Sequence, residues 1–225
     1  MFLSTDLSLS CLLLLLVLLI FVLYPLGQVG VASGVIVEVF FTLFMISGVT
    51  SITNRRSRQL GVTVIAISVL LSGWLGLVHP SVVVFVLKSV LTIAFLSTLI
   101  VIVLIQVFSA GPITFHRIQG AIAAYLLVAM LWGMFYRLVD VLKPEAFQRG
   151  PGAIAEPVLG VLTRECIFLS LATLTTLGYS GIVAVNSMTL SLVMSEALIG
   201  QLFPAILLAR LVSMEVTSRG GRKKA

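Results

Sequence analysis

The residues best placed to do chemistry lie in one short stretch, from Thr173 to Gly181, whose sequence is TLTTLGYSG. The stretch is small, polar and glycine-containing, yet it lies between long apolar segments. In lipid, backbone outside a helix or barrel survives only where protein buries it or where it lines a watery path. On a watery path, its carbonyl oxygens can coordinate a cation. The alternative is a polar turn between two apolar helices.

Composition shows what must hold this stretch in place. The chain has 225 residues, of which 60% are hydrophobic and only 10% charged, and its mean hydropathy is +1.22. A soluble domain is about one quarter charged. A membrane span needs roughly 20 apolar residues, and no charged residue lies between Asp6 and Glu38. The sequence therefore predicts an integral membrane protein surrounded by lipid.

The apolar segments predict an all-α fold with six transmembrane helices. We expect spans over residues 7–26, 31–52, 60–78, 81–108, 115–142 and 188–212. A short helix over 158–175 should enter the membrane without crossing it, after a water-exposed loop over 143–156. The first span could instead be a cleaved signal peptide, but Asp6 and the lack of Lys or Arg before it favour an uncleaved span.

The net charge of +6 comes from basic residues at segment ends and in the tail. This placement orients membrane spans, so we expect no nucleic-acid partner. With the N-terminus inside, the arginines of 55–58, His116-Arg117 and the basic tail all face the cytoplasm, as positive-inside topology requires. We expect a multi-pass protein of the plasma (cell inner) membrane with both termini cytoplasmic. The short helix would then enter from outside.

The Thr-Thr-Leu-Gly-Tyr run between spans five and six resembles the selectivity filter of the tetrameric potassium-channel superfamily. The run SEALIGQL in the sixth span is similar to bacterial six-span members with little cytoplasmic domain. The resemblance covers about residues 118–212, whereas spans one to four match only in number. It implies a four-helix membrane domain (1–113), a pore domain (114–213) and a basic cytoplasmic tail (214–225). It also implies a homotetramer, because one chain supplies one pore loop.

The resemblance assigns a role to each residue of the loop. The backbone of Thr176, Leu177, Gly178 and Tyr179 would bind K⁺, the tyrosine side chain would brace the loop, and no other cofactor is expected. The filter as a whole would comprise Thr175, Thr176, Leu177, Gly178, Tyr179, Ser180 and Gly181.

The family continues after the tyrosine with a second glycine and an aspartate, where this chain has Ser180 and Gly181. The left-handed backbone that such a glycine adopts is strained in a residue with a Cβ.

The resemblance as a whole makes a potassium-channel-like cation channel the leading hypothesis. The alternatives are a weakly selective Na⁺/K⁺ channel and a non-conducting scaffold or regulatory subunit with a degenerate filter. We expect no enzyme, because no constellation of acid, base and nucleophile is present.

Three residues of the sixth span extend the hypothesis to gating. Gly200 and Pro204 are candidate gating points, because glycine permits bending and proline removes a backbone donor. Close helix packing at Gly200 is the alternative. Glu196 lies four residues earlier, on the same helix face. It would form either a cation-attracting ring or, the interpretation that we favour, a hydrogen bond to the shell around the short helix.

The fourth span lacks the arginine repeat that a voltage sensor needs, since its one charged residue is Lys88. Glu38 in the second span lies at an equal depth, so we expect an intramembrane ion pair that braces the two helices. His79 and His116 lack further ligands at metal-binding spacing, so no metal site of that kind is predicted.

Overall fold

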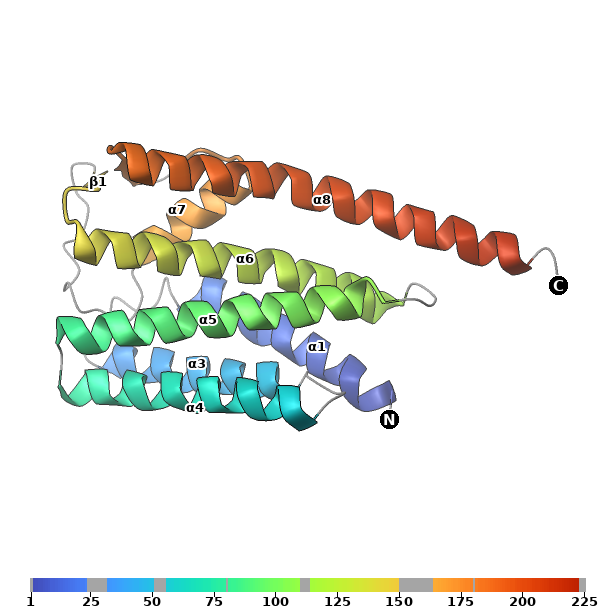
Figure 1. Cartoon of the computed structure of the whole chain (residues 1–225), viewed down its shortest axis with the longest axis horizontal. Coiled ribbons are helices and arrows are strands. Elements are labelled where there is room, and N and C mark those ends of the chain that lie inside the picture. The colour runs from blue at the N-terminus through green and yellow to red at the C-terminus, as the bar shows by residue number, and fades with distance from the viewer. Residues whose placement is uncertain are drawn as a thin grey trace.

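The computed structural model describes residues 2–23, 32–50, 56–79, 81–109, 114–149, 164–179 and 181–222. Figure 1 shows that this part of the chain is mostly helical, with long helices lying roughly side by side. The elements are α1 (Phe2–Leu18), the π-helix η1 (Leu19–Leu23), α3 (Ala32–Thr50), α4 (Arg56–Val78), α5 (Val82–Val107), α6 (Phe115–Leu142), β1 (Phe147–Arg149), α7 (Arg164–Leu174), β2 (Ile182–Ala184) and α8 (Ser187–Arg222).

Both chain termini lie at the same end of the molecule (Figure 1). The starts of α4 and α6 lie at that end too. The strand β1 and the end of α6 lie at the opposite end. The orientation of these ends across a membrane stays a prediction.

A single hydrophobic core runs through the helices. The helix α1 packs against both α3 and α6, and α3, α4, α5 and α6 pack against one another in succession. Core side chains extend from Leu9 of α1 to Leu174 of α7, and they include the fully buried rings of Phe41, Phe44 and Phe95. Helices on both sides of residue 113 share this core, because α1 and α5 both pack against α6.

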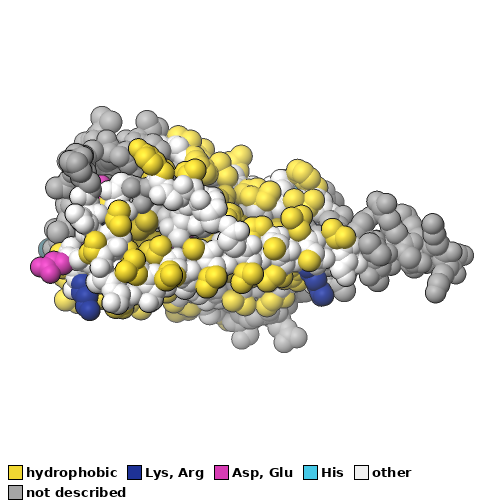
Figure 2. Space-filling model, turned by 90° about the horizontal axis from the view of Figure 1, so that it is seen from above, with side chains coloured by type: hydrophobic (Ala, Val, Ile, Leu, Met, Phe, Trp, Pro, Cys, Tyr) yellow, Lys and Arg dark blue, Asp and Glu magenta, His cyan; other side chains and the backbone are white. Residues whose placement is uncertain are grey.

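Three helices are long and apolar enough to cross a membrane: Val82–Val107, Phe115–Leu142 and Ser187–Arg210. The shorter apolar helices of the described chain are Leu9–Val22, Val35–Thr50, Leu60–Gly76 and Glu165–Leu174. Figure 2 shows hydrophobic side chains spread over one long face, with charged side chains only toward its ends. These features fit an all-α membrane protein, whereas the number of spans remains a prediction.

Two details go beyond the sequence-based expectation. The predicted sixth span, 188–212, lies in the last helix, of which Ser187–Arg210 is long and apolar enough to cross a membrane, and this helix continues to Arg222. The predicted loop over 143–156 contains β1, which pairs antiparallel with β2 beyond the filter-like stretch. The predicted short helix is present as Arg164–Leu174, and residues 158–163 lie outside the described chain.

Candidate functional site

The filter-like loop folds back over the end of α7. The helix ends at Leu174, and the next amide, of Thr175, still donates to Leu171 O at 3.0 Å. The amide of Gly178 then donates to Ala172 O at 3.1 Å, which returns the chain toward the helix that it has just left. The start of the loop is therefore fixed by hydrogen bonds to α7, while residues 177–179 follow neither helix nor strand.

Two residues of this loop have left-handed backbone. Thr176 has φ +57° and Gly178 has φ +68°, and they are the positive-φ residues among those described. For glycine this conformation is free of Cβ clashes, but for a threonine it costs roughly 1–2 kcal/mol. Strain of this kind persists only where the surroundings enforce it, and it gathers at functional sites. The structure thus places unusual backbone at two of the four residues predicted to bind a cation.

The loop is uncovered in the single chain. The side chains of Leu177 and Tyr179 are 67% and 78% exposed, and Thr175, Thr176 and Gly178 are exposed as well. Within the described part of this chain, the bracing contact predicted for Tyr179 is therefore not made. Ser180 lies outside the described residues, and a Cβ on Gly181 would meet nothing within 4 Å.

Glu196 joins three helices by hydrogen bonds. Its side chain is 0% exposed, and its carboxyl group accepts from the hydroxyls of Tyr136 on α6 and Ser170 on α7. The Ser170 hydroxyl also lies 2.7 Å from Ala129 O, within donating distance. Of the two interpretations of Glu196, this geometry supports a structural hydrogen bond to the shell around α7. The sequence does not indicate which residues supply the partners.

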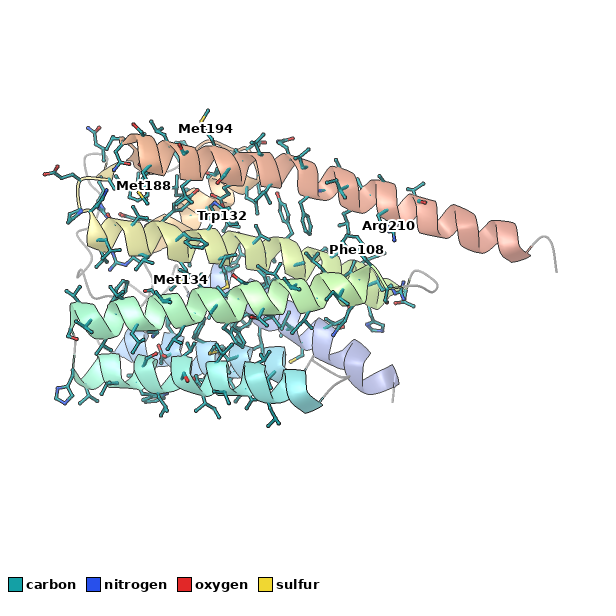
Figure 3. All side chains as sticks on the ribbon, viewed as in Figure 1. Phe108, Trp132, Met134, Met188, Met194 and Arg210 are labelled. Atoms are coloured by element: carbon teal, nitrogen blue, oxygen red, sulfur yellow. The ribbon has the colours of Figure 1, made fainter. Side chains whose placement is uncertain are left out.

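Further contacts hold α8 against α6 and α7. The indole Nε1 of Trp132 donates to Leu192 O at 3.3 Å, and Figure 3 shows this ring between α6 and α8. The opposite face of α8 carries exposed apolar side chains at every fourth position, and Figure 3 shows one of them, Met194, pointing away from α6. These side chains are Leu190, Met194, Leu198, Leu202 and Ile206.

Gly200 lies at the closest approach of α8 to α7. A Cβ at this position would lie 2.2 Å from the carbonyl oxygen of Leu174, which also accepts a hydrogen bond from Tyr125 at 2.9 Å. The structure therefore gives Gly200 the close-packing role that was the alternative to a hinge. The helix continues through Pro204 to Arg222, and gating at either residue remains a prediction.

The pair Glu38–Lys88 joins α3 to α5. Lys88 Nζ lies 2.8 Å from Glu38 Oε2, and the Glu38 side chain is fully buried. A Cβ on Gly73 of α4 would lie only 2.0 Å from Glu38 Oε1. The glycine thus leaves space for the ion pair, which gives it a role that spacing in the sequence does not reveal.

An outer cluster of charges lies beside the β1–β2 pair. Arg149 donates from Nη2 to Asp140 Oδ2 at 2.6 Å and from Nε to Glu165 Oε2 at 3.2 Å. Arg137 also reaches Asp140 Oδ2, at 3.3 Å. The hydrogen bond to Asp140 raises the pKa of the Arg149 guanidinium, so this group stays charged throughout the neutral range. Mixed charge in this loop is visible in the sequence, but these pairs are not.

No protein family, curated protein or solved structure matched the chain. The resemblance to potassium channels therefore rests on the residues of the filter-like loop and of α8. Within the described chain, the structure brings α6, α7 and α8 together below the loop. It keeps the Glu38–Lys88 pair in a different part of the helix bundle.

Proposed function

We propose that the chain is one subunit of a homotetrameric, potassium-channel-like cation channel. The observation that carries the proposal is the loop after α7, where left-handed backbone at Thr176 and Gly178 accompanies five exposed residues. Four such loops around an axis would surround a cation with carbonyl oxygens in place of its water shell. The proposed binding groups are the carbonyls of Thr176, Leu177, Gly178 and Tyr179.

The uncovered surfaces support assembly. The loop and the apolar stripe on α8 from Leu190 to Ile206 are exposed in one chain, and one chain supplies only one loop. Cyclic symmetry would let each copy present the same loop to the axis. The C-terminal end of α7 would then face that axis with its partly negative carbonyls, which favours a cation.

The proposed topology has six spans, with both termini in the cytoplasm. Its support is the placement of the termini and of the starts of α4 and α6 at one end of the molecule. In this orientation the β1–β2 pair lies outside, next to the entrance of the filter. The channel would pass monovalent cations passively, without an enzymatic step.

The test is cation flux into liposomes that contain the purified protein, with the assembly mass measured beforehand. We expect a tetramer and a flux carried by K⁺ in preference to Na⁺. Gly178→Ala should abolish the preference for K⁺ or the flux, because alanine is strained at φ +68°. The strain comes from the backbone alone, since nothing lies within 4 Å of the added Cβ. Gly61→Ala, also at an open position, is the matched control. A monomer, or equal behaviour of the Gly178→Ala and Gly61→Ala proteins, would contradict the proposal.

A further inference from the structure

The β1–β2 pair fixes the far end of the filter-like loop. Phe147 pairs with Ala184, Gln148 with Val183 and Arg149 with Ile182. The amide of Val185 extends the pairing by donating to Ala146 O at 3.1 Å. Since β2 begins at Ile182, three residues after Tyr179, the ladder holds the chain directly after the proposed cation-binding carbonyls.

A small hydrophobic cluster anchors this ladder to the helices. The buried side chains of Phe147, Ile182 and Ala184 pack with Tyr136 of α6 and Cys166 of α7. The rings of Tyr136 and Phe147 meet edge to face, with centroids 5.8 Å apart. Because Tyr136 also donates to Glu196, the ladder is connected to the contact between α6, α7 and α8.

Arg149 connects the same ladder to two helices by charge. Its guanidinium binds Asp140, near the end of α6, and Glu165, in the first turn of α7. The planar fork of arginine can donate to two carboxylates at once, whereas the point charge of a lysine holds such a geometry poorly. The strand β1 is thus tied both to the helix before it and to the helix that precedes the filter-like loop.

We propose that Arg149 is a positioning residue that sets the ion selectivity of the outer filter, an inference that rests on the proposed channel function. The loop is held at its start by the hydrogen bond from Gly178 to Ala172 and at its end by β2. Release of Arg149 removes the charged ties of the ladder to α6 and α7 and leaves only the hydrophobic cluster to anchor it, so the outer carbonyls are held less firmly. A site with loosely placed carbonyls discriminates less between K⁺ and Na⁺, because it adapts to the smaller ion.

The test compares the ratio of K⁺ to Na⁺ flux in liposomes among charge variants of the full-length protein. Arg149→Met should lower the ratio by roughly tenfold, which corresponds to about 1.4 kcal/mol, the scale of one lost hydrogen bond between charged groups. Lys143→Met removes an equal charge from an exposed residue near the ladder and should leave the ratio unchanged. Glu165→Met makes the opposite change in charge and removes the carboxylate that accepts from Arg149 Nε, so it loosens the same clamp and should lower the ratio as well. An effect of surface charge alone would change the ratio of K⁺ to Na⁺ flux in opposite directions in the Arg149 and Glu165 variants.

A reversible cross-link within the ladder separates strand pairing from anchorage to the helices. Gln148 and Val183 lie opposite each other in the ladder with exposed side chains. Facing antiparallel residues have Cα atoms about 4.5–5.5 Å apart, a separation that a disulfide can span. In an Arg149→Met, Cys11→Ser background, a disulfide between Gln148→Cys and Val183→Cys joins β1 to β2 but not to α6 or α7, so the lowered ratio should stay the same on oxidation and reduction. A ratio restored by oxidation would show that Arg149 acts on strand pairing and would overturn its role as the tie to the helices.

The outcomes separate this inference from the function on which it rests. A wild-type protein without cation flux would overturn the proposed function. Wild-type flux that is unselective, or that keeps its selectivity in Arg149→Met, would overturn only the role of Arg149. If neither Arg149→Met nor Glu165→Met assembles, the clamp is a requirement of folding and the inference is overturned.

Discussion

Gly200 offers a substitution for which packing and hinge roles predict opposite results. In Gly200→Ala, the new Cβ would lie 2.2 Å from the backbone oxygen of Leu174. Non-bonded contacts of this kind are not seen below 3.0 Å, so α8 and α7 would have to separate by at least 0.8 Å, the difference between these two distances. The oxygen cannot rotate away as a side chain would, and Tyr125 already holds it with a hydrogen bond.

Overpacking of this kind costs about 1–3 kcal/mol. For a chain of this size, each kcal/mol corresponds to ~2–4 °C in the unfolding midpoint, so we expect Gly200→Ala to lower the midpoint by several degrees. The assay is thermal unfolding of the purified protein in detergent. Gly61→Ala, with open space around its Cβ, is the control, and alanine should leave its midpoint unchanged or slightly raised.

A hinge role alone predicts a different sign. Alanine stiffens a helix and favours it by up to ~1 kcal/mol relative to glycine, so a glycine retained only for bending would give a higher midpoint on substitution. If the midpoint of Gly200→Ala equals or exceeds that of Gly61→Ala, the packing argument is wrong.

The remaining predictions concern the buried charges. Removing either Glu38 or Lys88 should lower the free energy of unfolding by about 3–5 kcal/mol, because the remaining partner is left buried alone. Glu38→Leu combined with Lys88→Met should lower it by less than either single change. Additive losses in unfolding midpoint would refute the pairing. Glu196→Ala should destabilise the folded protein by about 1–3 kcal/mol for each hydroxyl left unpaired. Glu196→Gln should preserve both stability and flux. A fall in conductance in Glu196→Gln would instead indicate a cation-attracting ring. Because α5 carries one charged residue and that charge is paired, currents in planar bilayers should show no steep dependence on voltage; gating that responds to several elementary charges would contradict this.

The sequence predicts the helices of the described chain well, because long apolar runs determine where they exist and roughly where they begin and end. The short helix before the loop was predicted in the same way, from a partly apolar segment too short to span the membrane. The equal depth of Glu38 and Lys88 followed from the rise per residue of a helix. Such features depend on local pattern.

The features that could not be predicted from the sequence depend on which helices contact one another. The strand pair β1–β2 joins residues more than thirty positions apart, and three-residue strands have no periodicity to detect. The glycines at 73 and 200 matter because of single atoms on other helices. Glu196 has two partners, Tyr136 and Ser170. Nothing in the sequence distinguishes these two residues, because only the packing of the helices brings them to Glu196.

The most direct test of the channel account is the reversal potential of currents through the wild-type protein in a planar bilayer, with K⁺ on one side and Na⁺ on the other. The account predicts currents in discrete steps and a reversal potential displaced in the direction set by a preference for K⁺. A reversal potential near zero would indicate the weakly selective channel and contradict ordered binding at Thr176–Tyr179. Verified tetramers that carry no current, even when Gly200 or Pro204 is altered to release a closed gate, would contradict the account as a whole.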